Sequence, residues 1–329
     1  MDFEFSDDET ALGEGMRRLC AGRFGLDRLR ALEGSSDVVG RDGWRVLAEA
    51  GVFSLRVQGD EGLGLGLAEA AVVFEELGRA LVPGPLAASH LAATLGIVPE
   101  AGTGDIVVGS VTRPRHSGSD AIAPVLVENL GALDQLVIVD DLCLSIVEPE
   151  SLEAVVVERS IDPLTPLWRL DRLPEGRKAG DGELASRWRR EEEILDAAFL
   201  VGLASVMLEL AVDYAKGREQ FGRAIGSFQA VKHLCADMLV RAEVARAATH
   251  AAAVTADQPD VGDLDRAGAG AALLAAEAAT ANGRSCIQVH GGMGFTWEVP
   301  AHLYVMRAKV VAARMRSAGE LAALVAERY

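Results

Sequence analysis

The chain has 329 residues, of which 50% are hydrophobic and 5% aromatic, and its formal net charge at pH 7 is −17. This length is enough for two or three domains with a substantial core, and the negative charge argues against nucleic-acid binding through phosphate neutralisation. The acidic start, Met1–Glu9, has neither the basic nor the apolar region of a signal peptide. Ile194–Val212 is almost long enough to span a bilayer, but Asp196 and Glu209 interrupt it. We therefore expect a cytoplasmic protein without a membrane segment.

The four cysteines are far apart in the chain and show no CxxC spacing: Cys20, Cys143, Cys235 and Cys286. Three of them lie in apolar surroundings. The pattern predicts buried free thiols in a reducing compartment, and neither a disulfide nor a metal site.

Apolar residues at helical spacing mark most of the first hundred residues. Residues 6–22 carry this pattern after Ser6 and Asp7, which can cap the free N–H groups of a helix. Residues 42–51 and about 67–81 carry the pattern again, with a run of glycines between them and Pro83-Gly84-Pro85 after them. The sequence predicts an N-terminal helical domain over residues 1–102.

A different pattern occupies residues 103–182. Short apolar runs rich in β-branched residues are separated by Gly, Asp, Asn or Pro, which indicates strands. These runs are Ile106–Val111, Pro124–Glu128, Gln135–Val139, Leu142–Val147 and Ala154–Val157. The segment after them, Leu173–Gly182, is rich in Pro, Gly and charge and is predicted to be a linker.

From about Glu183 the pattern is helical to the end of the chain. It predicts four long helices over Leu184–Lys216, Ser227–Ala256, Leu264–Val289 and Pro300–Arg328. Four antiparallel helices with short connections form an up-down bundle, here over residues 183–329. The predicted fold is therefore mostly α, with a small central β-domain.

Two glycine-containing segments connect helices of this bundle. Gly217–Gln229 reads GREQFGRAIGSFQ, and Gln288–Glu298 reads QVHGGMGFTWE. Each places glycines beside amide, guanidinium or aromatic side chains. This combination suits close backbone approach to a large, planar, anionic ligand such as a dinucleotide.

In this order, the two segments resemble the acyl-CoA dehydrogenase family of flavoproteins. The pattern Arg-x-Gln-Phe-Gly-x-x-Ile-x-x-Phe-Gln runs from Arg218 to Gln229, and Gln-x-x-Gly-Gly-x-Gly-Phe runs from Gln288 to Phe295. Trp44–Leu86 is similar to the family's N-terminal domain. The resemblance covers most of the chain and is weakest between about residues 100 and 185. It implies the family's three-part fold and FAD as the cofactor.

The resemblance also implies which residues contact the pyrophosphate and adenosine half of FAD: Arg218, Gln220, Phe221, Phe228, Gln229, Gln288, Gly291 and Gly292. A guanidinium offers fork-shaped, charge-assisted donors that suit phosphate oxygens. Structural alternatives stay open: a surface salt bridge for Arg218, core packing for the two phenylalanines, and helix capping for Gln229 and the glycines. Phe295 and Trp297 are predicted to be packing residues, and His290 a structural histidine.

The implied reaction is α,β-dehydrogenation of an acyl-CoA thioester, in which a carboxylate removes the α-proton. Many family members carry this glutamate in a Tyr-Glu-Gly-Thr segment, but the matching position here is Met315. Other members take the base from the first bundle helix, where Glu192 or Glu193 matches, and Asp237 resembles an acid of certain short steroid-dehydrogenase subunits. The structural alternatives are a solvated glutamate cluster over 191–193 and an Asp237 paired within the bundle.

The middle domain departs from the family pattern. The usual Thr-Glu-Pro-x-x-Gly-Ser-Asp segment is represented by Thr112–Asp120, with Arg113 in place of the glutamate, and the domain is short. A short subunit without the usual base resembles one half of the α2β2 dehydrogenases of actinobacterial steroid side-chain degradation. The resemblance therefore implies a homologous partner subunit, a bulky CoA thioester and an external electron-transfer acceptor. A catalytically silent structural subunit and a homotetrameric fatty acyl-CoA dehydrogenase are the alternatives.

Overall fold

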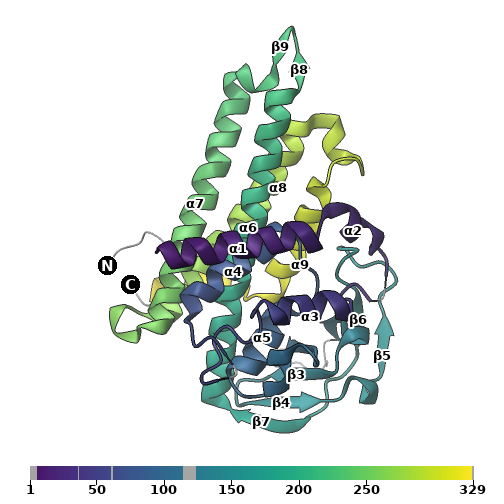
Figure 1. Ribbon diagram of the computed structural model, residues 1–329, viewed down its shortest axis with the longest axis vertical. Helices are drawn as coiled ribbons and strands as arrows, with labels where there is room; N and C mark the ends of the chain where they lie inside the picture. The colour runs from purple at the N-terminus through teal and green to yellow at the C-terminus, as the bar shows by residue number, and fades with distance from the viewer. Residues whose placement is uncertain (1–5, 36, 61, 114–123, 328–329) are drawn as a thin grey trace. The chain divides into compact units, whose positions relative to one another are not determined.

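The computed structural model describes residues 6–35, 37–60, 62–113 and 124–327 (Figure 1). The chain forms two compact units. The first comprises Met1–Leu26, Leu67–Val82 and Glu193–Tyr329, and the second comprises Asp27–Gly66 and Pro83–Glu192. The boundary between them falls inside one helix, α6, between Glu192 and Glu193.

The first unit is helical. Its helices are α1 (Asp7–Arg23), α4 (Leu67–Arg79), the greater part of α6 (Gly182–Gly217), α7 (Gln229–Asp257), α8 (Leu264–His290), α9 (Ala301–Arg314) and α10 (Ala318–Glu327). Helices α7 and α8 lie side by side over most of their length (Figure 1). The predicted cap of α1 is confirmed, because Ser6 and Glu9 form a reciprocal capping box.

Helices α4 and α6 approach each other unusually closely. A Cβ atom at Gly202 would lie 2.1 Å from the carbonyl oxygen of Glu75, and one at Gly78 would lie 2.1 Å from that of Phe199. One glycine on each helix thus lets the two backbones approach closely. In the described part of the chain, α6 is the one helix long and apolar enough to cross a membrane, and 78% of its most apolar stretch is buried inside the protein.

The second unit combines short helices with two small sheets. The helices are α2 (Leu26–Ala31), α3 (Arg41–Glu49) and α5 (Leu86–Thr94). One sheet has the order β1-β3-β4-β7 and the other β2-β6-β5. The strands are β1 (Val108–Thr112), β2 (Val125–Glu128), β3 (Gln135–Val139), β4 (Cys143–Val147), β5 (Ala154–Val156), β6 (Leu167–Leu170) and β7 (Arg177–Asp181). The pairing of β1 with β3 is parallel, and the other pairings are antiparallel.

The five predicted strands are confirmed, but two further strands were not predicted. Strand β7 lies inside the segment Leu173–Gly182, so the prediction of a linker is wrong there. Three of its five residues are charged (Arg177, Lys178 and Asp181), and all five are half-buried or exposed, because β7 lies at the edge of the sheet and, among the described residues, pairs with β4 alone. Such a strand carries no apolar alternation for sequence reading to detect.

The last predicted helix, Pro300–Arg328, is also two helices. The chain leaves the helical conformation at Met315, with ψ of 166°, and re-enters α10 behind Ser317. Ser317 and Glu320 exchange backbone and side-chain hydrogen bonds. This Ser-x-x-Glu pattern is a helix-start signal that the continuous apolar periodicity concealed.

Candidate functional site

The segment Arg218–Gln229 forms a β-hairpin between α6 and α7. Strands β8 (Glu219–Gln220) and β9 (Arg223–Ala224) are joined by Phe221 and Gly222, whose φ angles are +53° and +76°. Two consecutive positive φ values define the turn that matches the twist of a two-residue hairpin. Phenylalanine is poorly suited to this conformation, because its Cβ crowds the following carbonyl.

The side chains of this hairpin fall into two groups. Phe228 belongs to the hairpin's own packing, since the Arg223 guanidinium lies 4.1 Å from its ring centroid and the Phe221 ring meets it edge-on at 6.2 Å. The predicted cofactor residues Arg218, Gln220 and Gln229 are exposed, and Phe221 is 93% exposed. A strained, exposed phenylalanine indicates a position selected for something outside the hairpin.

The second predicted segment forms the end of α8 and a 3₁₀ turn, η6 (Gly291–Phe295). Gly291 has φ +58° and ψ −133°, a conformation that only glycine adopts readily, and its N–H caps α8 by bonding to the Ile287 and Gln288 carbonyls. A Cβ atom at Gly291 or Gly292 would meet no atom within 4 Å. The glycines therefore leave exposed backbone with open space beside it.

The two segments lie at the same end of the bundle. The Tyr214 ring on α6 stacks on the His290 ring on α8, with centroids 4.3 Å apart. His290 is buried, and its Nδ1 lies 2.8 Å from the Cys286 carbonyl oxygen, so it is the structural histidine that the sequence predicts. The hairpin's exposed Arg218, Gln220 and Phe221 thus share one end of the helices with Gln288, Gly291 and Gly292.

The three consecutive glutamates 191–193 on α6 have different surroundings. Glu191 is buried and binds Arg56 and Arg187, each at 2.7 Å. Burial would raise the pKa of Glu191, but the two guanidinium groups more than offset this and the pKa lies below its usual range. Glu193 is buried, and its two carboxylate oxygens accept hydrogen bonds from Nε and Nη2 of Arg316, at 2.7 and 2.5 Å. The predicted solvated cluster is therefore wrong for these two.

Glu192, which lies between Glu191 and Glu193 in the sequence, is half-buried. Its Oε1 accepts a hydrogen bond from the Ser110 hydroxyl at 2.5 Å, and its Oε2 accepts one from the Trp188 indole at 3.2 Å. Both donors are neutral groups of the second unit.

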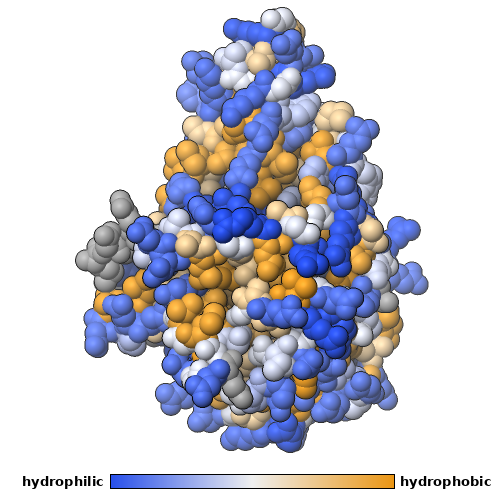
Figure 2. All heavy atoms as spheres, in the orientation of Figure 1, coloured by the Kyte–Doolittle hydropathy of each residue, from blue (hydrophilic) through white to orange (hydrophobic). Residues whose placement is uncertain are grey.

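Asp237, the other predicted acid, is exposed on α7. On the same helix, Leu239, Val240 and Val244 are 49%, 60% and 47% exposed. We call these three residues the α7 apolar surface. Figure 2 shows hydrophobic surface on the visible face of the bundle, below the hydrophilic end that carries the hairpin. Phe295 after the glycine turn is 82% exposed, so the prediction that it is a packing residue is wrong. Trp297 is 65% exposed, but its ring packs edge-on against His302 with centroids 4.4 Å apart.

Family models match both ends of the chain. The acyl-CoA dehydrogenase N-terminal domain matches residues 6–105, and the acyl-CoA dehydrogenase C-terminal domain matches residues 190–313. The chain belongs to the acyl-CoA dehydrogenase family. Members of this family are oxidoreductases whose cofactor is FAD.

Individual relatives agree with this assignment. The chain is 37% identical over 336 aligned residues to acyl-CoA dehydrogenase FadE34 of Mycobacterium tuberculosis, which covers 92% of this chain but only 45% of FadE34. It therefore spans about half the length of that relative. Acyl-CoA dehydrogenase IpdE2 of the same species is 34% identical, with 96% of this chain and 95% of IpdE2 covered.

Solved structures show the same fold. The ChsE4–ChsE5 complex from Mycobacterium tuberculosis contains a chain that matches with a TM-score of 0.85 at 22% identity, covering 99% of this chain and 98% of that one. A Tcur3481–Tcur3483 steroid ACAD variant matches with a TM-score of 0.84 at 24% identity, covering 98% of each chain. The predicted fold class, mostly α with a small β-domain in the family's arrangement, is confirmed.

The end of the bundle fits the nucleotide half of FAD in its chemistry. Arg218 supplies a guanidinium for phosphate oxygens, and Gln220 and Gln288 supply amide donors. The open backbone at Gly291 and Gly292 admits a close approach. The side chains of Arg218, Gln220 and Gln288 and the backbone of the two glycines are exposed.

The family's usual base position and ring-side segment have other occupants here. Met315 is only 8% exposed and offers no carboxylate. Arg113, in place of the usual glutamate, donates to the Leu173 and Pro174 carbonyls and pairs with Asp140 at 2.9 Å. It thus ties strand β1 to neighbouring loops. Residues 114–120 of the same predicted segment lie outside the described residues.

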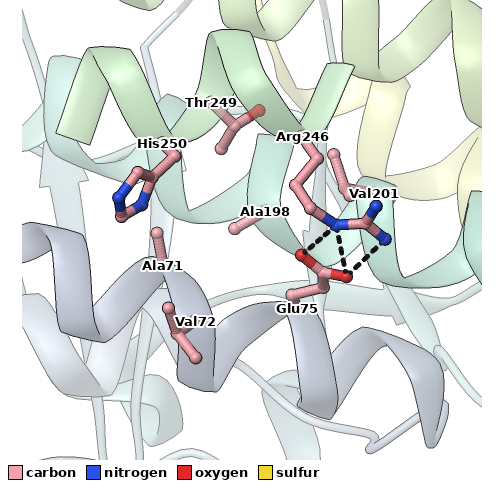
Figure 3. Close-up of a pocket in the computed structure, with 8 residues that line it drawn as sticks. All are labelled: Ala71, Val72, Glu75, Ala198, Val201, Arg246, Thr249 and His250. Atoms are coloured by element: carbon pink, nitrogen blue, oxygen red, sulfur yellow. Dashed lines mark hydrogen bonds and ion pairs between the residues drawn. The ribbon is translucent and has the colours of Figure 1, made fainter. Parts of the chain in front are cut away.

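A small cavity within the first unit has a structural character. It is lined by Ala71, Val72, Glu75, Ala198, Val201, Arg246, Thr249 and His250 (Figure 3). Arg246 on α7 reaches across to Glu75 on α4 at 2.9 Å and also binds Ser205 on α6. Burial opposes the charge of Arg246, but Glu75 and Glu243 outweigh it and raise its pKa. Arg246 therefore joins α7 to α4 through the ion pair and to α6 through the hydrogen bond, and the space beside it is too small for a cofactor.

Three residues near these sites were not predicted. Ser110 and Trp188 bind Glu192, and the fully buried Asn282 donates to the Ala204 and Met238 carbonyls of α6 and α7. A lone serine in a strand and a tryptophan on a helix carry no motif. The i, i+4 spacing of Trp188 and Glu192 is the one signal in the sequence that could have indicated a contact.

Proposed function

We propose that this chain is a subunit of an FAD-dependent acyl-CoA dehydrogenase that catalyses α,β-dehydrogenation of a CoA thioester in the cytoplasm. We further propose that it shares its FAD sites with a homologous partner subunit, in an α2β2 assembly. The substrate class we favour is a bulky thioester such as that of a steroid side chain. An external electron-transfer acceptor would reoxidise the flavin.

The exposed end of the bundle carries this proposal. Phe221 is 93% exposed in a strained conformation, and Phe295 and Trp297 in the segment Gln288–Glu298 are largely exposed. Together with the α7 apolar surface, these side chains are typical of a surface that another subunit covers. A nucleotide bound between Arg218 and the glycine turn would then lie at a subunit boundary.

Two structural relatives support a mixed assembly and a steroid substrate. One is a chain of the ChsE4–ChsE5 complex, and the other belongs to a Tcur3481–Tcur3483 steroid ACAD. At 22% and 24% identity they establish only the fold, so the partner and the substrate remain our proposal.

Within this proposal, Glu192 is the base that takes the α-proton of the thioester. FAD, when bound, supplies the acceptor for the hydride that leaves the β-carbon, and a double bond forms between the two carbons. Glu192 is half-buried and accepts hydrogen bonds from Ser110 and Trp188, and its neighbours Glu191 and Glu193 each pair with an arginine. Asp237 is the alternative base, and its exposure on α7 would let it act only in a site completed by a partner.

A catalytically silent subunit is the second candidate function. The observation that favours it is Met315, which occupies the usual base position with a buried apolar side chain. A homotetrameric fatty acyl-CoA dehydrogenase is the third candidate. It requires that copies of this chain alone complete the FAD site.

Flavin content tests these candidates directly. The chain is expressed alone and together with a homologous family subunit from the same organism, and each product is analysed for mass, for flavin absorbance and for turnover of a steroid side-chain CoA thioester. We expect full flavin loading only in the mixed product, and loss of loading with Arg218→Gln. Full loading and turnover by the chain alone would reject the shared site. Turnover of the mixed product that survives both Glu192→Gln and Asp237→Asn would indicate the silent subunit.

A further inference from the structure

Each oxygen of the Glu192 carboxylate accepts a hydrogen bond from a different element of the second unit. Ser110 on β1 donates to Oε1 at 2.5 Å, and Trp188, one helical turn earlier on α6, donates to Oε2 at 3.2 Å. A carboxylate held at one oxygen can still rotate about its last torsion, whereas one held at both is fixed in orientation. The arrangement therefore sets the direction in which the remaining lone pairs of Glu192 point.

Both donors are themselves rigidly supported. Trp188 is fully buried, and its indole N–H is a donor only, so it needs an acceptor at this place. Ser110 sits in β1, paired in register with Val137 of β3. The outer edge of β1 is tied to α5, because Ser89 exchanges hydrogen bonds with the N–H and the carbonyl of Val108 at 2.9 and 3.0 Å. The donors thus belong to packed elements rather than loops.

The neighbouring Glu191 shows what a different choice of donor does. Two guanidinium groups stabilise its charge, which favours a structural anion. Hydroxyl and indole N–H groups donate single, directional hydrogen bonds, so they fix the orientation of a carboxylate. Ser110 and Trp188 are therefore suited to orienting the Glu192 carboxylate.

We propose that Ser110 and Trp188 are positioning residues that hold Glu192 in the orientation required for abstraction of the α-proton. This inference rests on the proposed function of Glu192 as the base. It assigns a role to two side chains that the family's motifs do not include.

The test compares Ser110→Ala with Ser110→Thr, which keeps the hydroxyl, and with Ser145→Ala, which removes a buried serine from strand β4 of the same sheet. In the flavin-loaded complex, with a steroid side-chain CoA thioester, we expect Ser110→Ala to lower kcat about tenfold with little change in KM. Ser110→Thr should restore most of the rate, and Ser145→Ala should leave it unchanged. Because a hydrogen bond to the charged form lowers a carboxylate pKa, the acid limb of the pH–rate profile should move to higher pH in Ser110→Ala.

A second readout does not depend on activity. In the isolated full chain labelled with ¹³C at the glutamate carboxyls, the Glu192 resonance is assigned by its absence in Glu192→Gln and titrated. Its pKa should rise in Ser110→Ala and again in Trp188→Phe, which removes the indole N–H. If Trp188→Phe fails to fold, the serine series alone decides the matter.

The outcomes separate the inference from the function on which it rests. Full turnover in Glu192→Gln would remove Glu192 as the base, whatever the serine variants do. Loss of turnover in Glu192→Gln with a wild-type rate and a wild-type Glu192 pKa in Ser110→Ala would overturn the positioning role and leave the base in place. Equal losses in Ser110→Ala and Ser145→Ala would show a structural effect of the sheet, and would also overturn it.

Discussion

The end of the bundle and the surroundings of Glu192 are built in opposite ways. At the bundle end, the side chains of Arg218, Gln220, Phe221 and Gln288 are exposed. Around Glu192, every carboxylate oxygen has a donor, and the donors lie on buried or paired elements. Under the proposed function, this difference means that the chain orients Glu192 by itself, whereas the exposed residues at the bundle end would be ordered by a cofactor and a partner.

The largest effect on activity is expected from replacing Glu192, the residue whose carboxylate is held by hydrogen bonds. Replacing Glu192 by Gln keeps the shape of the side chain but removes its basicity. The amide oxygen can still accept from the Trp188 indole, while the amide NH2 group would donate to the Ser110 hydroxyl oxygen. We expect kcat to fall by about 10²–10⁴-fold, the usual contribution of a positioned base. Flavin absorbance and the unfolding temperature should stay near those of the wild type.

Asp237→Asn is the matched comparison for this prediction, and Asp260→Asn at the exposed η5 turn (Pro259–Val261) is the control for loss of a surface charge. Steady-state turnover of the flavin-loaded complex is the measurement. A large loss in Asp237→Asn with normal turnover in Glu192→Gln would transfer the base to α7. It would also reverse the comparison, because the reactive acid would then lie on the unsupported surface.

The pH dependence of stability tests the environment of His90, a buried histidine of the second unit. His90 is fully buried, and burial, aided by Arg56, lowers its pKa from 6.5 to about 4. The unfolded chain therefore binds a proton between these pH values that the folded chain excludes. The free energy of unfolding contributed by a neutral His90 is complete above pH 6.5, and about 3 kcal/mol of it is lost as the pH falls to about 4.

Chemical denaturation of the chain between pH 8 and pH 4 measures this loss. The His90→Gln variant should be less stable at pH 8, but its stability should fall less steeply between pH 6.5 and 4, because one titrating group has been removed. Identical slopes in the two proteins would show that His90 is not excluded from protonation in the folded state.

A packing substitution gives a smaller effect in the helical unit. Gly202→Ala places a methyl group 2.1 Å from the backbone carbonyl oxygen of Glu75, so α4 and α6 must separate. We expect a loss of about 1–3 kcal/mol in the free energy of unfolding, as for other overpacked cores. Gly270→Ala on α8 is the matched control, since its Cβ meets nothing within 4 Å.

In that control, the better helix propensity of alanine should raise stability by about 0.5–1 kcal/mol. Opposite signs in the two variants, measured by denaturation of the isolated chain, would confirm that the α4–α6 approach is the reason for glycine at 202. Equal effects would contradict it.

Sequence reading found the elements whose signals are local. The capping box at Ser6, the apolar periodicity of α6, α7 and α8, and the β-branched runs of β1 to β5 all lie within a few residues of the structure they specify. It missed β7, whose polar residues form a strand only because β4 lies beside them, and it missed the break at Met315.

The site shows the same division. The Gly-Gly turn and the Arg-x-Gln-Phe-Gly hairpin were recognisable because their residues are contiguous. The environment of Glu192 was not, since Ser110 is 82 positions away and reaches it only through the folding of β1. The three glutamates 191–193 are identical in sequence, and only long-range partners such as Arg56 and Arg316 distinguish them.

The smallest expected change in stability concerns the unsupported side of the comparison, and its sign is informative. Phe221 adopts φ +53° at the hairpin turn, a conformation that asparagine tolerates far better. Phe221→Asn should therefore raise the free energy of unfolding of the isolated chain by about 0.5–1 kcal/mol, because left-handed strain costs about 1–2 kcal/mol in an ordinary residue.

The same Phe221→Asn variant should weaken assembly with the partner subunit tenfold or more, roughly the loss of one aromatic anchor from an interface. Leu142→Asn, at a position 80% exposed in the second unit, controls for the removal of an exposed apolar side chain and should leave assembly unchanged. Chemical denaturation and analytical ultracentrifugation of the mixed complex measure the two effects. A more stable chain that assembles as well as the wild type would show that the strain at Phe221 serves no contact with another subunit, and the contrast between the two regions would then lose its explanation.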